Sequence, residues 1–373
     1  MDVLKYKSFF RAALKNNILN ILKHIALVTP TLTPGGSERV ISEVANYFQF
    51  QKNVQVHIIL LTGGEVFYDL GENIKIHLPN FDYRKYNRVI FTLKIFKYLR
   101  NKLNEVRPYS FLCFGGRYNS FAILAAYGLG IKTYISDRSR PGISYGWLID
   151  YLNIYIYKKA TGIITQTQYA KSLIEKSIDH SNIRIIGNPI QTVPYSILKR
   201  KKIILNVGRF IESKHQDWLI DYFNQINNLE WKLWFVGDGP TREKCTERAN
   251  QSKLKDNITF WGNQKKITDF YLQSSIFAFT STSEGFPNAL GEAMAAGCAC
   301  ISFDCTAGPS DLIDNSINGF LVDLNNHKHY IEMLRKLMLN EHLRNNFSTN
   351  AKEKMKKYST DNICYEFYQT LIQ

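Results

Sequence analysis

Residues 275–303 read SIFAFTSTSEGFPNALGEAMAAGCACISF, in which two short apolar runs flank a segment of small and helix-forming residues. The runs SIFAFTS (275–281) and ACISF (299–303) have the length and composition of buried strands. Pro287 suits the first turn of a helix that returns the chain to the start of the second strand. A strand, a crossover helix and a second strand make a parallel pair. The stretch therefore predicts one unit of a parallel α/β sheet.

The same alternation continues on both sides of this unit. In the second half of the chain we expect further strands at KIILNVG (202–208), KLWFVGDG (232–239), NITFWG (257–262) and GFLVD (319–323). The first half repeats the pattern, with strands expected at HIALVT (24–29), VQVHIILL (54–61), SFLCF (110–114), KTYIS (132–136) and TGIITQT (161–167). Two such series predict two doubly wound, Rossmann-like domains, with ligands in a cleft at the carboxyl ends of the strands.

The composition between the two series suggests the domain boundary. The segment GNPIQTVPYSILKRKK (187–202) has two prolines, a glycine and a basic run, but no clear period. We expect a basic N-terminal extension (1–22), a first domain (23–190), a linker (191–202), a second domain (203–355) and a C-terminal helix (356–373) that can cross back to the first domain.

Composition excludes several classes of protein. The chain has 373 residues, 45% of them hydrophobic, which is too long for one compact core and too apolar for a disordered or collagen-like chain. The longest uncharged apolar run starts at Phe121 and is only half of the roughly 20 residues of a spanning helix. Residues 1–20 lack the unbroken apolar core of a signal peptide. We therefore expect no transmembrane helix and no export.

The cysteines predict neither a disulfide framework nor a metal site. Six cysteines are few for so long a chain, and Cys298, Cys300 and Cys305 have no histidine near them in sequence to complete a zinc site. We expect small buried thiols in a reducing cytoplasm, and no bound metal.

The net charge of +15 is unevenly distributed along the chain. Residues 1–190 hold 25 lysines and arginines against 12 acidic residues, a net charge of +13, whereas residues 191–373 hold 22 against 20. Such asymmetry indicates that the first half faces an anionic partner: nucleic acid, an anionic bilayer surface or a phosphorylated substrate. The composition alone does not distinguish among these three kinds of partner.

Two loops carry groups suited to a phosphorylated ligand. In TPTLTPGGSERV (29–40), Gly35 and Gly36 allow close backbone approach, and a helix start beyond them attracts anions, although a plain turn capped by Ser37 explains the loop equally well. In NVGRFIESKHQDWLI (206–220), Arg209 and Lys214 can supply a forked and a point donor to a diphosphate. The alternative for the second loop is a solvated, charged turn.

The third loop carries the strongest signal, because Glu284 and Glu292 flank a predicted loop-to-helix junction. Two carboxylates there can accept hydrogen bonds from hydroxyls at separate points of an extended ligand, and free amides near Asn288 and Ala289 can face its charged centre. Glutamates on a helix are usually solvated. The frame of small apolar residues around Glu292 predicts close packing instead.

These motifs together resemble glycosyltransferase family 4, the retaining enzymes of GT-B architecture. The resemblance covers residues 22–325 and rests on GGSERV, GNPI, VGRFIESKHQDWLI, FVGDGP, FWG and SEGFPNALGEAMAAGCACIS, followed by GPSDLI and NGFLV. The segment ISDRSRPG is most similar to bacterial enzymes that add hexose or N-acetylhexosamine units to lipid-linked glycans. The resemblance implies a donor that is a nucleotide diphosphate sugar, expected to be UDP-linked, and a lipid-linked or surface-polysaccharide acceptor.

The resemblance also implies roles for the charged residues. Arg209 and Lys214 would clamp the donor diphosphate and offset the negative charge that grows on the leaving group. Glu284 would hold hydroxyls of the transferred sugar, and Glu292 would hold the ribose. In such enzymes a donor phosphate oxygen is proposed to take the acceptor proton in a front-face displacement, so no protein nucleophile, cofactor or metal is expected. The absence of an Asp-x-Asp motif agrees with metal-independent chemistry.

Further binding roles implied by the resemblance fall on backbone groups. Gly35 and Gly36 would let the first domain close over the diphosphate. Amides around Phe286, Asn288 and Ala289 would add donors to the sugar and the phosphates. The base would lie beside Gly237, Gly262 and Asn263.

One position departs from the family pattern. Where many relatives carry a histidine after the fifth strand, this chain has Ser136, Asp137 and Arg138. Asp137 or Arg138 can take over part of that region's catalytic work. A helix-capping Asp137 with a neighbouring arginine is an equally open interpretation.

Residues 82–102, DYRKYNRVIFTLKIFKYLRNK, interleave basic and aromatic side chains. Val89, Leu93, Phe96 and Leu99 recur at helical spacing, which predicts a helix packed on the first sheet with a cationic outer face. We expect this face and the basic N-terminal extension to lie on an anionic bilayer, which places the enzyme on the cytoplasmic side of the membrane.

Two rival functions remain open from sequence. A nucleic-acid-binding protein would explain the charge, but no basic and stacking residues are grouped into a recognised binding module, so no nucleic-acid partner is expected. A GT-B nucleotide-sugar epimerase would need acid/base carboxylates in the cleft. Product analysis without an acceptor separates an epimerase from a transferase.

Overall fold

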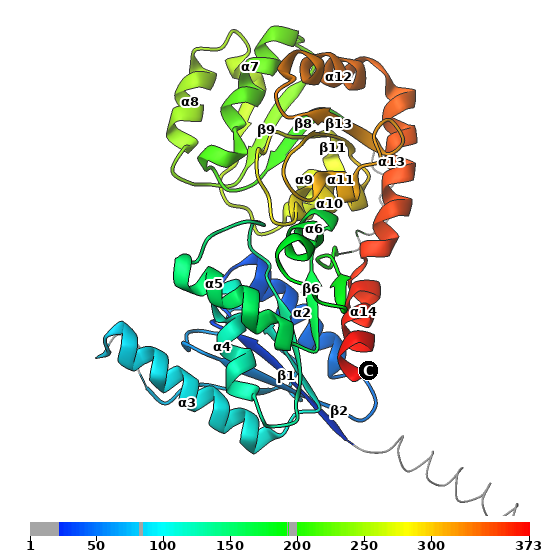
Figure 1. Cartoon of the computed structure of the whole chain (residues 1–373). Coiled ribbons are helices and arrows are strands. Elements are labelled where there is room, and N and C mark those ends of the chain that lie inside the picture. The colour runs from blue at the N-terminus through cyan, green and yellow to red at the C-terminus, as the bar shows by residue number, and fades with distance from the viewer. Residues whose placement is uncertain (1–21, 82–84, 192, 194–199) are drawn as a thin grey trace, which may run out of the picture.

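The computed structural model describes residues 22–81, 85–191, 193 and 200–373 (Figure 1). Nearly all of the expected N-terminal extension therefore lies outside the described residues. The same holds for the start of the expected helix at 82 and for most of the expected linker.

The first domain is built on a seven-stranded parallel sheet in the order β3-β2-β1-β4-β5-β6-β7. Its strands are β1 (Lys23–Thr29), β2 (Val54–Leu60), β3 (Lys75–His77), β4 (Ser110–Phe114), β5 (Lys132–Ser136), β6 (Gly162–Thr165) and β7 (Ile183–Ile185). Its helices are α2 (Gly36–Phe48), α3 (Arg88–Val106), α4 (Gly116–Ala126), α5 (Trp147–Ile156) and α6 (Gln168–Ser177). The central strands are buried along most of their length, which explains why they read as continuous apolar runs.

The second domain repeats this design on a six-stranded parallel sheet in the order β10-β9-β8-β11-β12-β13. Its strands are β8 (Lys201–Val207), β9 (Lys232–Val236), β10 (Ile258–Phe260), β11 (Ser274–Phe279), β12 (Ala299–Asp304) and β13 (Gly319–Asp323). Its helices are α7 (Gln216–Ile226), α8 (Arg242–Asn250), α9 (Ile267–Gln273), α10 (Asn288–Ala296), α11 (Pro309–Leu312), α12 (His327–Leu339) and α13 (Glu341–Met355). The predicted pair of doubly wound parallel domains is confirmed.

The sequence pattern located most of the strands but missed two at the edges of the first sheet. β3 and β7 have three residues each, too few for a periodic signal. In the second domain β8 begins at Lys201, inside the segment expected to be linker.

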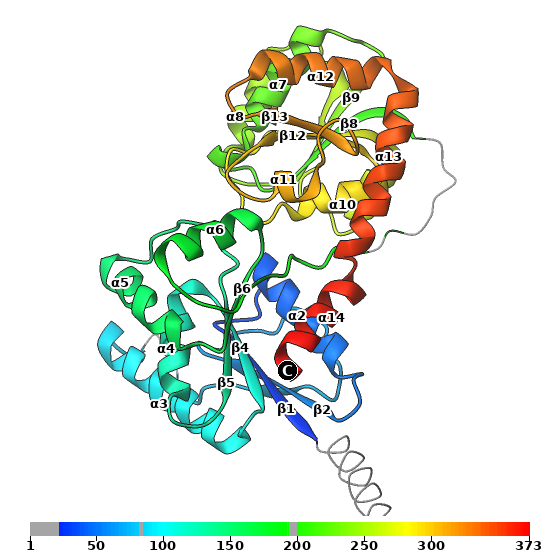
Figure 2. The same ribbon diagram turned by 45° about the vertical axis from the view of Figure 1, so that its right-hand side comes forward.

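The chain returns to the first domain at its C-terminus. After α13 has run along the second domain, α14 (Thr360–Ile372) packs on α2 and β4 of the first, as the orange-to-red helices in Figures 1 and 2 show. The Ser110 hydroxyl donates to the carbonyl of Leu371 at 2.7 Å. The apolar face of α14 thereby joins a cluster of buried side chains to which both domains contribute.

The prediction of the apolar face of α3 is wrong at two positions, where the side chains are exposed. Val89 and Leu93 are 69% and 65% exposed, whereas Ile95, Leu99 and Leu103 form the buried face. The fully buried residues of α3 begin at Ile95, whereas its first turn, capped by Asn87, contributes only the partly buried Phe91 to the core. Val89 and Leu93 instead line a surface hollow.

All six cysteines are buried free thiols, which agrees with their expected structural role. Of the helices in the described part of the chain, none combines the length and apolar character needed to cross a bilayer.

Candidate active site

The carboxyl ends of the strands in the two sheets face each other. Polar contacts across the boundary include an ion pair of Arg39 in α2 with Glu292 in α10 at 2.8 Å. The Asn188 amide donates to the side chain of Asn288 at 2.9 Å, and the Gln168 N–H donates to Asp311 at 2.9 Å. Figures 1 and 2 show α6 beneath α10 and α11 at this boundary. Loops far apart in sequence thereby share one interdomain site.

Lys214 and Glu284 meet in this site. The Lys214 ammonium lies 2.5 Å from a carboxylate oxygen of Glu284 and 5.0 Å from the centre of the Phe279 ring. Both side chains are largely buried, with 19% and 10% exposed. Because the loop after β8 supplies the lysine and the loop after β11 supplies the glutamate, packing of adjacent strands positions the pair.

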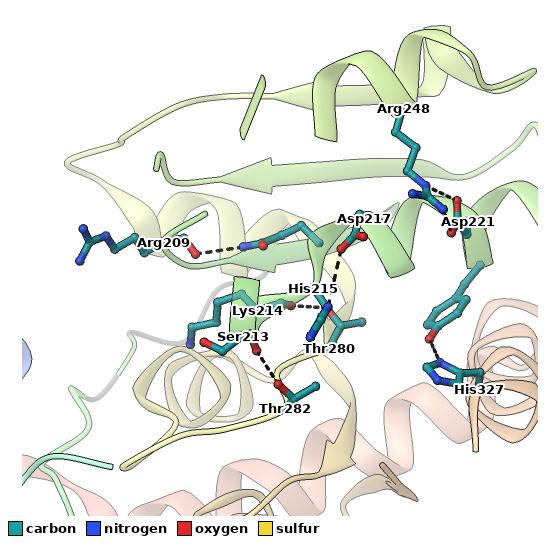
Figure 3. Close-up of polar contacts among 12 residues, drawn as sticks. Arg209, Ser213, Lys214, His215, Asp217, Asp221, Arg248, Thr280, Thr282 and His327 are labelled. Carbon is teal, nitrogen blue, oxygen red and sulfur yellow. Dashed lines mark hydrogen bonds and ion pairs between the residues drawn. The ribbon is translucent and has the colours of Figure 1, made fainter. Parts of the chain in front are cut away.

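The short turn that carries Lys214 is anchored by backbone hydrogen bonds. The Thr282 N–H donates to the carbonyl of Ser213 at 2.9 Å, and the Thr280 hydroxyl donates to the carbonyl of Lys214 at 2.8 Å (Figure 3). His215, with a positive φ of 46°, ends the turn and stacks on Trp218 with ring centroids 3.7 Å apart. Lys214 is thus held on a fixed backbone.

Arg209 follows β8 and is exposed. Figure 3 shows its side chain extended away from the other labelled groups. Within the described parts of the chain, no carboxylate forms an ion pair with its guanidinium. Arg209 therefore keeps its five N–H donors for an anionic ligand.

Glu292 lies in the second turn of α10 and is held from two sides. One carboxylate oxygen accepts from Arg39 at 2.8 Å, and the other accepts from the Tyr271 hydroxyl at 3.0 Å. A carboxylate offers about four lone-pair sites, so Glu292 retains capacity for ligand hydroxyls. Burial, followed by the charge of Glu292, raises the pKa of Tyr271, which keeps its hydroxyl a donor.

Arg39 also approaches a second carboxylate. Its Nε lies 3.9 Å from Glu43 Oε1, one turn further along α2. Burial raises the pKa of Glu43 to about 7, while the positive charge of Arg39 opposes this rise. The charge at this edge of the site therefore changes near neutral pH.

Three of the predicted glycines occupy distinct environments. Gly237 has a φ of 132°, and a Cβ there would lie 2.0 Å from the carbonyl oxygen of Gly208, so the loops after β8 and β9 pack too closely for any side chain. Gly262 has a φ of 65° beside Asn263. A Cβ at Gly36 would lie 3.6 Å from the Asn288 side chain, which places the glycine loop directly opposite α10.

The start of α2 bears on one of the two interpretations of the glycine loop, a plain turn capped by Ser37. The helix begins at Gly36 with Gly35 as its N-cap, while the Ser37 hydroxyl donates to Glu38. Ser37 therefore does not cap the helix. The amide and carbonyl of Gly35 both bond to the Tyr68 hydroxyl, at 2.9 and 2.7 Å.

The expected amide donors at α10 are partly used within the protein. The Asn288 N–H donates to the carbonyl of Phe286 at 2.9 Å, so it is not free for a ligand. The ring of Phe286 packs against Tyr358, with centroids 5.9 Å apart. Ala289, next along α10, packs partly buried against the core shared by the domains.

Asp137 does not cap a helix, because α5 begins ten residues later at Trp147. Its carboxylate accepts from the Tyr145 hydroxyl at 2.8 and 3.0 Å and from the Ser139 amide at 2.9 Å. The carboxylate therefore lies beside a phenol at the carboxyl end of β5.

Arg138 is half-buried at the junction between the domains. It donates to the carbonyls of Ile186 and Gly187 at 2.9 and 3.3 Å, and it lies over the Phe367 ring. Burial lowers its pKa to about 9. Arg138 thus ties β5 to the segment that leads into the linker.

Sequence reasoning missed the two residues that hold Glu292. Arg39 belongs to the quoted GGSERV motif, where its charge next to a glycine loop was an available signal. Tyr271 lies on a short helix without a motif, and only the fold brings it to Glu292.

Two facing parallel-sheet domains, with cations and carboxylates at their opposed strand ends, have the GT-B architecture. Residues 34–193 match the family model for Glycosyltransferase Family 4, and residues 190–354 match that for Glycosyl transferases group 1. The chain belongs to glycosyltransferase family 4.

Named relatives are similar along nearly their whole length. The chain is 24% identical over 349 residues to the amylovoran biosynthesis glycosyltransferase AmsD of Erwinia amylovora, covering 91% of this chain and 96% of that one. It is 23% identical over 372 residues to the N-acetylgalactosamine-N,N'-diacetylbacillosaminyl-diphospho-undecaprenol 4-alpha-N-acetylgalactosaminyltransferase of Campylobacter jejuni, covering 94% and 100%. Both are named as transferases, so they give the epimerase alternative no support.

A solved structure shares the fold. Anabaena HepE, in complex with UDP and glucose, superposes with a TM-score of 0.77 at 15% identity, over 93% of this chain and 99% of that one.

Proposed function

We propose that this protein is a retaining transferase that moves a hexose or N-acetylhexosamine from a UDP-sugar to a lipid-linked or polysaccharide acceptor in bacterial glycan synthesis. The observation that carries the proposal is the largely buried Lys214–Glu284 pair at the strand ends, together with Arg209 after the same strand β8, which forms no ion pair within the described residues. A UDP-linked donor is supported by the complex of HepE with UDP and glucose. A lipid diphosphate acceptor is supported by the name of the Campylobacter relative.

In this proposal the cations of the second domain bind the donor diphosphate. Arg209 offers a forked set of donors, and Lys214 offers a point charge fixed by Glu284 and Phe279. Both charges stabilise the leaving diphosphate as the glycosidic bond breaks. The position of Lys214 is set before the donor arrives, so little reorganisation of this cation is needed during the reaction.

The two glutamates hold opposite ends of the donor. Glu284 accepts hydrogen bonds from hydroxyls of the transferred sugar, and Glu292 accepts them from the ribose. Arg39 and Tyr271 orient the Glu292 carboxylate, which leaves its remaining lone pairs for the ribose. Arg39 is a positioning residue supplied by the first domain, so domain closure and ribose binding are linked.

Chemistry proceeds on the face of the sugar that carries the leaving group. The acceptor hydroxyl oxygen forms a bond to the anomeric carbon while the bond to the diphosphate oxygen breaks, and the acceptor proton passes to a donor phosphate oxygen. No nucleophile from the protein and no metal are required by this route. In this route Asp137, whose carboxylate accepts from the Tyr145 hydroxyl, would position an acceptor hydroxyl.

The location proposed for the enzyme is the cytoplasmic face of the membrane. The charge of +13 in residues 1–190 is of the sign that attracts the domain to anionic lipid, and binding there would place the cleft beside a lipid-linked acceptor. Nucleic acid is not a proposed partner.

A donor panel combined with two variants tests the proposal. A UDP-sugar at about one hundred times its Kd should stabilise the native protein by about 2.7 kcal/mol, visible as a rise in Tm that GDP-sugars do not give. Lys214→Ala and Glu292→Ala should abolish transfer while leaving the fold cooperative. Lys232→Ala and Glu247→Ala alter exposed charges of the same domain and serve as matched controls. Near-normal turnover in either site variant would contradict the assigned site.

A further inference from the structure

Two hollows lie on the face of the first domain formed by α3, α4 and α5. Helices α3 and α5 each pack on α4. One hollow of about 570 Å³ lies over α4, and a second of about 690 Å³ lies beside it toward the start of α5. Arg88, Thr92, Arg117 and Ile149 line both, so the two hollows adjoin and form one groove. Each has the volume of a small-molecule site.

The first hollow is lined mainly by apolar side chains from all three helices. They are Phe91, Ile95, Phe121, Leu124, Leu152 and Ile156. Leu124 and Leu152 remain 41% and 40% exposed. Apolar side chains gathered in a concave surface, instead of scattered singly, indicate a binding site for an apolar ligand.

Two arginines stand where the hollows join. Arg88 and Arg117 are exposed, and in the described parts of the chain no carboxylate lies within ion-pair distance of either guanidinium. Paired arginines with unused forked donors match the geometry of phosphate oxygens. The groove therefore combines an apolar compartment with an anion-binding rim.

The second hollow leads to the interdomain site. Its lining includes Tyr145, whose hydroxyl donates to the Asp137 carboxylate at 2.8 Å. Asp137 follows β5 at the carboxyl edge of the sheet. Along the groove, apolar side chains are thus followed by arginines and then by the polar groups of the active site.

We propose that this groove binds the acceptor's lipid diphosphate, with the first isoprenoid units in the apolar hollow and the diphosphate on Arg88 and Arg117. The inference rests on the proposed function and gives its acceptor site a location. A polyprenyl diphosphate sugar has its apolar chain, its diphosphate and its sugar in the same order as the groove has complementary groups. The sugar then lies near Tyr145 and Asp137, next to the donor.

The rim of the groove is suited to a membrane surface. Trp147 and Leu148, at the start of α5, are 81% and 52% exposed, and Val89 and Leu93 face them from α3 across the second hollow. Exposed tryptophan beside basic residues is typical of surfaces that meet the bilayer interface. A lipid chain could therefore pass from the bilayer into the groove without crossing water.

Farnesyl diphosphate is a soluble probe for this site, and calorimetry on the full-length protein without donor measures its binding. We expect saturable binding that farnesol and inorganic diphosphate do not match. Leu152→Glu, which puts a carboxylate in the apolar hollow, and Arg117→Ala, which removes a charge-assisted donor, should each weaken binding about tenfold or more. Leu339→Glu and Arg335→Ala make the same changes at exposed sites on α12 and should have no effect. Leu124→Glu replaces Leu152→Glu if that variant does not melt cooperatively.

Several outcomes would overturn the inference. Equal binding by all variants, equal binding of inorganic diphosphate, or displacement of the probe by UDP would each place the probe elsewhere. A concentration-dependent dimer that Leu152→Glu abolishes would assign the groove to a second copy of the chain. Glu292→Ala should retain probe binding while losing the UDP-sugar. Donor binding without probe binding therefore contradicts only the groove, whereas probe binding without any donor binding contradicts the proposed function.

Discussion

Arg39 lies close to two carboxylates, those of Glu292 and Glu43, and so links their electrostatics. Its ion pair with Glu292 crosses between domains, whereas Glu43 lies one turn away on the same helix. Burial raises the pKa of Glu43, so this carboxyl is protonated more readily than that of an ordinary glutamate. A protonated Glu43 attracts Arg39 less, and Arg39 then pairs mainly with Glu292. The protonation of Glu43 therefore affects how firmly Glu292 is held.

Glu43→Gln should remove a pH dependence of stability. The pKa of Glu43 is raised from 4.5 to about 7, so the native state keeps a proton that the unfolded chain has lost. This contribution is complete below about pH 4.5 and is lost as the pH rises through about 7. At pH 8 the variant should therefore be more stable than the wild type, by an amount on the order of 3 kcal/mol, and the two should converge toward pH 5. Tm measured from pH 5 to 8 checks this.

Glu65→Gln is the matched control, because Glu65 is exposed. It should leave the slope of Tm against pH unchanged. Parallel curves for the wild type and Glu43→Gln would show that Glu43 is ionised throughout this range.

At the residue scale, sequence predicted the groups that belong to local motifs. The spacing of Glu284 and Glu292 across a loop-to-helix junction was readable, as was the pairing of Arg209 and Lys214 after a strand. The partners of these groups were not readable. Arg39 and Glu292 are 253 positions apart, and only the packing of two domains brings them together.

At the scale of elements, the loops after β8 and β9 depend on close backbone contact. The Gly237 N–H donates to the carbonyl of Gly262, and the Gly208 N–H donates to the carbonyl of Val236. These hydrogen bonds fix the backbone of the loop that carries Arg209 and Lys214.

Gly237→Ala should destabilise the second domain by more than about 3 kcal/mol, because the new Cβ meets the Gly208 carbonyl oxygen at a positive φ. Gly128→Ala is the control, since Gly128 also has a positive φ but no atom lies within 4 Å of its added Cβ. The control should lose about 1–2 kcal/mol from backbone strain alone. Urea unfolding of the three proteins compares them, and equal losses would show that the close contact relaxes without cost.

Helix α14 presents a second test at this scale. Phe367 is fully buried with its ring 6.1 Å from that of Phe114, and Arg138 lies over it. Phe367→Ala should cost about 3–5 kcal/mol in the free energy of unfolding. Tyr365→Ala, on the exposed face of the same helix, should change it by less than about 0.5 kcal/mol. Similar values for both would mean that α14 contributes little to the fold.

Long elements with a strong period were predictable, and short or edge elements were not. The buried strands β1, β4 and β11 gave continuous apolar runs, whereas β3 and β7 are too short to do so. The face of α3 was misassigned because helical spacing marks apolar positions without stating which of them the domain covers. Val89 and Leu93 have the right period and lie at the surface.

For the whole molecule, sequence predicted two parallel-sheet domains and the uneven charge, but not how the domains join. One cluster of buried side chains continues from the first domain through α14 into the second. Such a cluster depends on contacts between distant segments, which no local pattern encodes. The same limit applies to the groove, whose three helices lie in separate parts of the chain.

The uneven charge leads to a prediction for the entire protein: binding to anionic vesicles should depend strongly on salt. Each lysine or arginine near an anionic surface contributes about 1 kcal/mol, and screening shortens its reach to about 10 Å at 0.1 M salt. Sedimentation with phosphatidylglycerol vesicles should therefore recover the protein at low salt and release it at high salt, whereas neutral phosphatidylcholine should bind it weakly. Lys97→Glu on α3 and Lys158→Glu just after α5 reverse exposed charges of the first domain and should weaken binding, while Lys253→Glu in the second domain should not. If reversal in either domain weakens binding equally, the net charge of the whole chain and not the charge of the first domain directs the protein to the membrane.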